Sequence, residues 1–372
     1  MSADTGRVAG ALGAQLSGAG LVAMGVGAVT NQPEPEGWES APPLEETHIN
    51  MLREAGIAVT AIGTNRAEGR VTVFLSKALP ARLTRLMPEE IGEVSVHFRA
   101  QRVPAVNPGR QATHAGLLTD AARGQATAIP CGSSISPGNA RLAGTMGALV
   151  QLQEDGFQTL YGLTCNHVTG GCNNVPQGMP VVSPGILDVD QRTERIAVIG
   201  YQDRFLPLRQ GLESVLTGGD NDDAALFRIH DPNLVSSAQG RGMDTPETVI
   251  EPEGGMRVRK AGSATGIRRG VVDEFTTLAN PYNYQVPINA REIRSFRGTC
   301  NFRRVWRIDS SGDSFAERGD SGALVTTDPD AGEEPAAIGL LIAAETNGDA
   351  YIVPLGPLLE KFGARLVAGH NR

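Results

Sequence analysis

The chain has 372 residues, of which 40% are hydrophobic and 5% aromatic, and it contains 46 glycines and 23 prolines. This composition excludes a disordered polymer and favours many short strands and turns over long helices. The formal net charge of −8 and the absence of a long basic run exclude nucleic acid as the main partner.

The N-terminal part, residues 1–45, combines a Gly/Ala-rich stretch with a Pro- and Glu-rich one. Residues 8–33 carry no charge and are numerous enough to span a bilayer. They contain few large apolar side chains, however, and lack a basic lead and a cleavage site. We therefore expect a flexible arm, or a packed Gly/Ala segment, in place of a membrane span or a secretion signal. The stretch "NQPEPEGWESAPPLEE" that follows is typical of a linker.

Residues 46–125 are expected to form a small α/β domain and a connector. "EETHINMLREAG" has helical spacing and ends at a glycine, whereas "IAVTAIGTN", "RVTVFLS" and "EIGEVSVHFRA" alternate as strands do. Residues 106–130 are polar, have no clear period and are interpreted as the connector.

The remaining region, residues 126–372, consists of short apolar runs separated by Gly, Pro, Asn and Asp turns. This pattern predicts an all-β barrel or sandwich. The stretch "GPLLEKFGARLV" at 356–367 predicts a closing helix.

The four cysteines lie at positions 131, 165, 172 and 300. They are too few for a disulfide framework in a chain of this length, although Cys165 and Cys172 are near enough in sequence to bridge. No CxxC motif or Cys/His cluster indicates zinc, so no metal site is expected. We interpret this pattern as that of a reducing compartment, which places the protein in the cytoplasm. Cys165 is interpreted as a small packing residue.

A candidate nucleophile is Ser321 in "ERGDSGALV". Glycines flank the Asp-Ser pair, and an apolar run follows, so the serine would lie on a turn that leads into a buried strand. Read alone, the motif is equally compatible with a surface turn.

The base and the carboxylate that such a serine needs have candidates in His167 and Asp223. His167 follows a strand and precedes a glycine-rich loop in "LTCNHVTGG", and taken alone it is more typical of a structural histidine in a core or loop. Asp223 directly precedes the strand pattern "AALFRI", which favours it over its competitors Asp220 and Asp222.

Together these motifs resemble those of chymotrypsin-like serine proteases. "LTCNHV" is similar to the family's histidine motif, "DAAL" to its aspartate motif and "GDSGALV" to its nucleophile motif. "CGSSISPGNARLAGTMGALVQL", "SPGILDVD" and "RKAGSATGIRRGVV" resemble a narrower branch, the trypsin-like peptidases found in bacteria and in plant NARROW LEAF-type proteins. The resemblance covers roughly residues 130–365.

The resemblance implies a mostly β fold with two six-stranded barrels and the triad in the cleft between them. Ser321 would be the nucleophile, His167 the general base and then acid, and Asp223 the group that orients the histidine. The backbone amides of Gly319 and Ser321 would form the oxyanion hole. The implied protein is a serine endopeptidase with no cofactor, a protein or peptide substrate and a homo-oligomeric state.

Two features concern activation and specificity. In family members that are activated by cleavage, the new N-terminal amine pairs with the aspartate before the serine. No such activation sequence precedes the first barrel here, so the resemblance implies another partner for the Asp320 carboxylate, a cation or backbone amides. The intact chain is therefore expected to be active, or to be switched by assembly or a partner. Phe315, Ala343 and Ala344 are the candidates for the substrate pocket, which favours small or medium apolar residues before the scissile bond.

Two alternatives stay open at this point. One is a binding or scaffold protein on the same fold without catalysis, and the other is an esterase that uses the same triad.

Overall fold

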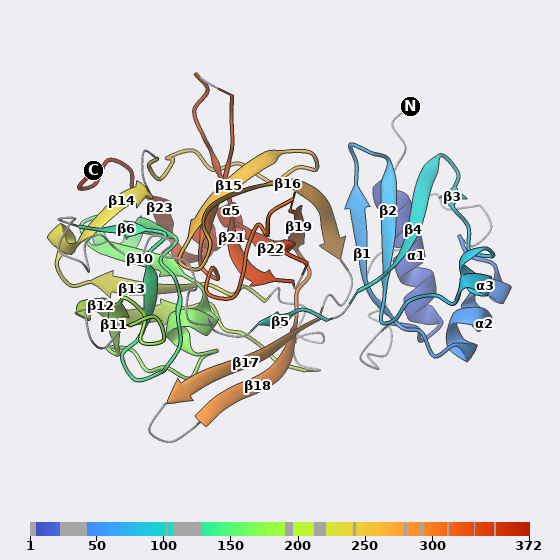
Figure 1. Ribbon diagram of the computed structural model, residues 1–372, viewed down its shortest axis with the longest axis horizontal. Coiled ribbons are helices and arrows are strands. Elements are labelled where there is room, and N and C mark those ends of the chain that lie inside the picture. Colours follow the sequence, from blue (N-terminus) through green and yellow to red (C-terminus); the bar gives the residue numbers. More distant parts are fainter. Residues whose placement is uncertain are drawn as a thin grey trace.

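The computed structural model describes residues 5–22, 43–101, 103–106, 128–189, 196–211, 221–240, 243–277, 281–289, 294–310, 312–330, 332–345 and 347–372. Three parts follow one another along the chain, an N-terminal α/β unit and two β units, and Figure 1 shows the α/β unit at one end of the molecule.

The N-terminal unit is a small mixed sheet with helices beside it. Strand β1 pairs antiparallel with β2, β2 runs parallel to β4, and β3 pairs with β4. Its own apolar core lies between the helices and the sheet. The elements are α1 (Thr5–Gly18), α2 (Glu46–Glu54), β1 (Val59–Asn65), β2 (Arg70–Leu75), α3 (Ala81–Thr84), β3 (Glu90–Ile91) and β4 (Val94–Ala100).

The helix and strands predicted between residues 45 and 100 are confirmed, but the flexible arm is not what residues 5–18 form. They form α1, and the chain here corresponds to the packed Gly/Ala alternative. Val8, Leu12 and Leu16 are spaced four residues apart, so they share one helical face, which is buried in the unit's core. No helix among the described residues is long and apolar enough to cross a membrane. The predicted linker at 31–46 lies largely outside the described residues, as does most of the connector.

The first β unit is a curled sheet with the order β23-β9-β10-β13-β12-β11-β7-β8. A short parallel pair, β14 with β6, accompanies it. The elements are β6 (Ile129–Cys131), β7 (Ser134–Pro137), β8 (Gly144–Thr145), β9 (Ala148–Leu152), a 3₁₀ turn (Gln153–Asp155), β10 (Leu160–Thr164), a π-helical turn (Asn166–Gly170), β11 (Pro180–Ser183), β12 (Ala197–Phe205), β13 (Ala225–Ile229), a 3₁₀ turn (Pro232–Leu234) and β14 (Val235–Gln239).

The second β unit closes into a barrel of six strands. The order β15-β20-β21-β22-β19-β16 returns to its start because β16 also pairs with β15. Its interior is a separate apolar core. The elements are β15 (Arg257–Gly262), β16 (Gly266–Thr277), β19 (Val305–Asp309), β20 (Leu324–Thr327), β21 (Ala337–Ala344), β22 (Ala350–Pro354), α5 (Leu355–Phe362) and β23 (Ala364–Leu366).

The mostly β fold class with a small α/β N-terminal domain is confirmed, with two corrections. Only the second unit closes through strand pairing among the described residues, whereas the first is a curled, open sheet. The C-terminal helix is shorter than predicted, because Gly363 adopts a φ of +61° and ends α5. Residues 364–366 then form β23, which pairs with β9 and so returns the chain to the first β unit.

A long hairpin, β17 (Pro281–Asn289) with β18 (Arg294–Asn301), leaves the second barrel between β16 and β19. Strand β5 (Ala105–Val106), which follows the N-terminal unit, pairs in parallel with β17. Figure 1 shows this hairpin projecting from the β units with β5 beside it. Buried side chains of the hairpin join the core cluster of the first β unit. The hairpin therefore connects all three parts of the molecule.

Candidate active site

His167 is held in a π-helical turn that follows a fully buried strand. Strand β10 leads into this turn, which ends at Gly171 with a φ of +57°. The amide side chain of Asn166 donates to Asn173 and to the carbonyl of Leu206, at 2.7 and 2.9 Å. The loop is thus fixed on both sides of the histidine by hydrogen bonds within the first β unit.

His167 and Asp223 form a direct pair. The Nδ1 atom of His167 lies 2.5 Å from Oδ2 of Asp223, and the His167 amide donates to Oδ1 at 3.0 Å. Both side chains are 0% exposed. The Nε2 atom of His167 has no hydrogen-bond partner among the described residues. A carboxylate on Nδ1 fixes the tautomer in which Nε2 is the free acceptor.

The competing carboxylate of Asp222 has a different partner. Asp222 forms an ion pair with Lys361, and Asp220 lies outside the described residues.

Tyr284 is a contact of this pair that sequence reasoning missed. Its hydroxyl donates to Oδ2 of Asp223 at 2.9 Å, and its ring packs edge-on against the His167 ring with centroids 5.8 Å apart. Burial, reinforced by the charge of Asp223, raises the pKa of Tyr284 well above its ordinary value, so the phenol keeps its proton and donates. The tyrosine comes from β17, and no local motif marks it.

Ser321 lies on the turn that enters β20, where it contacts the first β unit. Its carbonyl accepts from the Thr145 amide at 2.8 Å. Gly322 has a φ of +93°, and a Cβ there would come within 2.3 Å of Thr164 Oγ1, so this glycine serves the approach of the two β units. The Ser321 side chain is 8% exposed.

The Oγ atom of Ser321 donates to the carbonyl of Ile342 at 3.4 Å. Within the described part of the chain it makes no hydrogen bond to His167. The structure thus joins His167 to Asp223 directly but leaves Ser321 turned toward β21.

The candidate oxyanion hole lies in the same turn. Gly319 has a φ of +108°, which favours glycine. Its carbonyl accepts from Thr145 Oγ1 at 2.8 Å and from Ser263 Oγ at 2.7 Å, which fixes the peptide plane. In the described parts of the chain, the amides of Gly319 and Ser321 donate to no protein acceptor.

Asp320 has the partners that sequence reasoning required, a cation and backbone amides. Its carboxylate lies 2.8 Å from Nζ of Lys260, and both side chains are 0% exposed. The amides of Ala264, Thr265 and Glu317 and the Thr265 hydroxyl also donate to it, at 2.7 to 3.2 Å. A Cβ on Gly262 would come within 2.3 Å of the carboxylate, so the pair depends on that glycine.

These contacts keep Asp320 ionised. Burial alone would raise the pKa of Asp320, but Lys260 and the other donors lower it below its ordinary value. Burial lowers the pKa of Lys260, and the charge of Asp320 opposes that effect. Because the carboxylate accepts from several donors besides Lys260, the ionised pair is the form favoured near neutral pH.

The three candidate pocket residues differ in exposure. Phe315 is 0% exposed and lies in the core of the second barrel. Ala343 is buried on β21, and Ala344, the next residue, is half-buried.

The described cysteines are all free and buried. The Sγ atom of Cys165 donates to the carbonyl of Leu341 at 3.2 Å. Burial raises the pKa of Cys165 well above its ordinary value, which is consistent with the packing role.

One group of possible metal ligands occurs among the described residues, Cys165 with His167 and Asp223, whose ligand atoms lie within 4.8 Å of one another. Both Asp223 oxygens and Nδ1 of His167 are engaged in hydrogen bonds with each other or with Tyr284. A metal would also require the thiolate of Cys165, which its raised pKa disfavours. The arrangement fits a hydrogen-bonded pair better than a metal centre.

Neither a scan against protein-family models nor a search of curated proteins finds a match. Among solved structures, the chain is similar to Protease A of Thermobifida fusca, with 21% identity and a TM-score of 0.40 over 65% of this chain and 100% of that chain. It is also similar to a Nocardiopsis protease, with 19% identity and a TM-score of 0.40 over 64% and 98%. A third is Cellulomonas bogoriensis chymotrypsin, with 18% identity and a TM-score of 0.38 over 64% and 98%. These similarities assign no role to any residue, and the role of each residue rests on its contacts in this chain.

Proposed function

We propose that the protein is a serine endopeptidase with Ser321, His167 and Asp223 as its triad. The observation that carries the proposal is the buried His167–Asp223 pair. It leaves Nε2 of the histidine without a partner, in a structure where the Ser321 turn packs against the strand that precedes that histidine. A histidine oriented in this way is a general base for a hydroxyl nucleophile.

The reaction begins when Ser321 Oγ attacks the carbonyl carbon of a peptide bond and His167 Nε2 takes the hydroxyl proton. The amides of Gly319 and Ser321 stabilise the negative charge that develops on the carbonyl oxygen. The protonated His167 then gives its proton to the leaving amine, which yields an acyl-enzyme. Water then attacks this ester while His167 takes its proton, the acyl–Oγ bond breaks as His167 returns that proton to Ser321 Oγ, and the acid product leaves.

The proposal includes activity of the intact chain, with or without a switch by assembly or a partner. In chymotrypsin-like proteases that require cleavage, a new N-terminal amine pairs with the aspartate before the serine. Here Lys260 supplies a cation to Asp320 within the uncut chain. Support for the oxyanion loop therefore does not require a new N-terminus.

Substrate preference and family branch are further parts of the proposal. Ala343 and Ala344 on β21 would narrow a pocket more than glycines, which favours small or medium apolar residues before the scissile bond. The branch with bacterial and plant NARROW LEAF-type members is proposed on the motifs at 131–152, 183–190 and 259–272. The homo-oligomer implied by this branch stays a prediction.

The test is labelling of the intact chain with a fluorophosphonate probe. We expect labelling of the unaltered protein and its loss in both Ser321→Ala and His167→Ala, because an activated serine needs nucleophile and base. Labelling that survives in Ser321→Ala would place the nucleophile elsewhere. If the unaltered chain is not labelled, the binding or scaffold alternative gains support, and a panel of peptide and ester substrates separates a peptidase from an esterase.

A further inference from the structure

The Asp223 carboxylate is fully buried and accepts hydrogen bonds from two residues. One oxygen accepts the His167 amide, and the other accepts both His167 Nδ1 and the Tyr284 hydroxyl. Without the tyrosine, every hydrogen bond that the described residues make to this carboxylate would come from His167, the residue that it has to orient. Tyr284 is thus an independent anchor for the carboxylate.

The Tyr284 side chain is itself rigidly placed. It is 2% exposed and stacks on the Phe302 ring with centroids 6.4 Å apart. Its ring also contacts the His167 ring, so the tyrosine touches both members of the pair. A buried hydroxyl that is fixed in this way loses little freedom when it donates.

Strand β17 is supported by β5, a segment from much earlier in the chain. Tyr284 pairs with Val106 of β5, and the Asn283 amide donates to the carbonyl of Pro104 at 2.9 Å. Val106 is 2% exposed and lies in the same core cluster as Tyr284. The segment that leaves the N-terminal unit therefore supports the strand that carries the tyrosine.

We propose that Tyr284 is a positioning residue of the triad, whose hydroxyl holds Asp223 in the orientation that His167 needs, and that β5 holds Tyr284 in place. This inference rests on the proposed function for its catalytic consequence. Its structural content, the control of the His167–Asp223 pair by a hydroxyl from the hairpin, is measurable without any substrate.

The experiment compares the intact chain with Tyr284→Phe, which removes only the hydroxyl. The matched control is Tyr282→Phe, because Tyr282 is buried on the same strand and packs on Phe302 and Tyr351. The first readout is the rate of fluorophosphonate labelling. The second is the far-downfield proton resonance of the His167 Nδ1–H, assigned by its loss in His167→Ala. A merely structural tyrosine would not move that resonance.

We expect Tyr284→Phe to slow labelling about tenfold, as the loss of one hydrogen bond to a charged group implies. We also expect its Nδ1–H resonance to shift or to exchange faster, while Tyr282→Phe matches the unaltered chain in both readouts. A labelled chain in which Tyr284→Phe changes neither readout would overturn the inference and leave the protease proposal intact. An unlabelled chain whose resonance still responds to Tyr284→Phe would reject the protease and support the positioning role. Absence of the resonance from the unaltered chain would overturn the His167–Asp223 hydrogen bond and the inference with it.

Discussion

Asp320 carries a buried negative charge directly before the candidate nucleophile. Lys260 is its cationic partner, and the remaining donors are amides and a hydroxyl of neighbouring loops. One of those amides belongs to Glu317, in the same turn as Gly319, so the carboxylate fixes the turn that presents the candidate oxyanion amides. The Lys260–Asp320 pair thus neutralises a buried charge in the barrel and also fixes the turn of the candidate site.

Replacing Lys260 with Met should destabilise the protein and disorganise this turn. Removing one partner of a buried ion pair leaves the other charge uncompensated, which costs about 3–5 kcal/mol. We expect the free energy of unfolding in urea to fall by that amount, and labelling of Ser321 to fall with it.

The double variant Lys260→Met/Asp320→Asn is the matched control, because it removes both charges. It should regain much of the lost stability if charge pairing is the cause. A Lys260→Met protein that unfolds and labels as the unaltered chain does would contradict this account of Asp320.

At the scale of elements, the site combines local loops with a remote strand. The π-helical turn after β10 carries His167 on the first β unit, and the turn before β20 carries Ser321 on the second. The hairpin β17–β18 adds Tyr284, and β5 pairs with that hairpin. The first two elements are visible as sequence motifs, whereas the last two act through pairing that only the fold creates.

Shortening Val106 to Ala should loosen the support of β17. Deleting two buried methyl groups costs about 2 kcal/mol, and the resulting space lies beside the strand partner of Tyr284. We expect slower labelling of Ser321, with the Tyr284 hydroxyl still present.

Val71→Ala provides the comparison, because Val71 is equally buried but lies in the core of the N-terminal unit. It should lose similar stability in urea without a matching loss of labelling below its unfolding transition. Equal labelling losses in the two variants would mean that β5 has no particular effect on the site.

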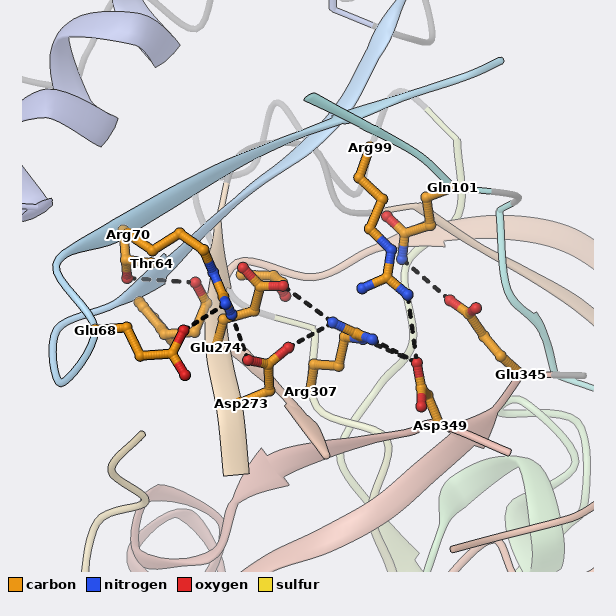
Figure 2. Close-up of polar contacts among 12 residues, drawn as sticks. Thr64, Glu68, Arg70, Arg99, Gln101, Asp273, Glu274, Arg307, Glu345 and Asp349 are labelled. Carbon is orange, nitrogen blue, oxygen red and sulfur yellow. Dashed lines mark hydrogen bonds and ion pairs between the residues drawn. The ribbon is translucent and has the colours of Figure 1, made fainter. Parts of the chain in front are cut away.

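At the scale of the whole molecule, the N-terminal unit is fused to the second barrel. Strand β1 pairs with β16, and Arg70 of β2 forms an ion pair with Asp273 of β16 at 2.5 Å. Figure 2 shows Arg307 at the centre of this junction, between Asp273, Glu274 and Asp349. The charged side chains of this junction form one network, and they are buried to different degrees.

Other contacts of the same junction extend it toward β21 and β22. In Figure 2, Arg99 reaches Asp349, and Gln101 donates to Glu345 at 3.3 Å. Arg307 forms ion pairs with three carboxylates of this network, and its side chain is 4% exposed.

Arg307→Met should destabilise the whole protein by about 3–5 kcal/mol. It removes the cation that pairs with the buried Glu274, and it leaves Asp273 and Asp349 only with Arg70 and Arg99, which are more exposed than Arg307. Arg257→Ala is the matched control. Arg257 pairs with Asp330 at the same 2.5 Å distance, but its side chain is 59% exposed, so we expect a much smaller loss of stability from its removal. Chemical denaturation of both variants measures the difference, and similar losses would refute the role of burial.

Only the parts of the site that are marked by a local sequence pattern could be predicted from the sequence. A glycine-flanked serine before a strand, a histidine after a strand and an aspartate at a strand start each indicate a turn at the edge of a β unit. Contact between His167 and Asp223 followed from that pattern, and the choice of Asp223 over Asp222 followed from the strand that it precedes. The role of Ser321 as nucleophile stays a prediction, since its hydroxyl is turned to Ile342.

Many of the strands could be predicted from the sequence alone, because alternation and glycine placement are properties of neighbouring residues, but the hairpin strands β17 and β18 were not among those predicted. The family resemblance implied that Asp320 is buried, and the cost of a buried charge then implied that it needs a cation or amides. Which groups meet that need was decided only by the tertiary structure. Lys260, Tyr284 and the buried face of α1 contact residues that are far away in the sequence, and only strand pairing and core packing bring these residues together. Their local sequence patterns occur at many other residues of the same type, so the patterns alone could not identify these partners.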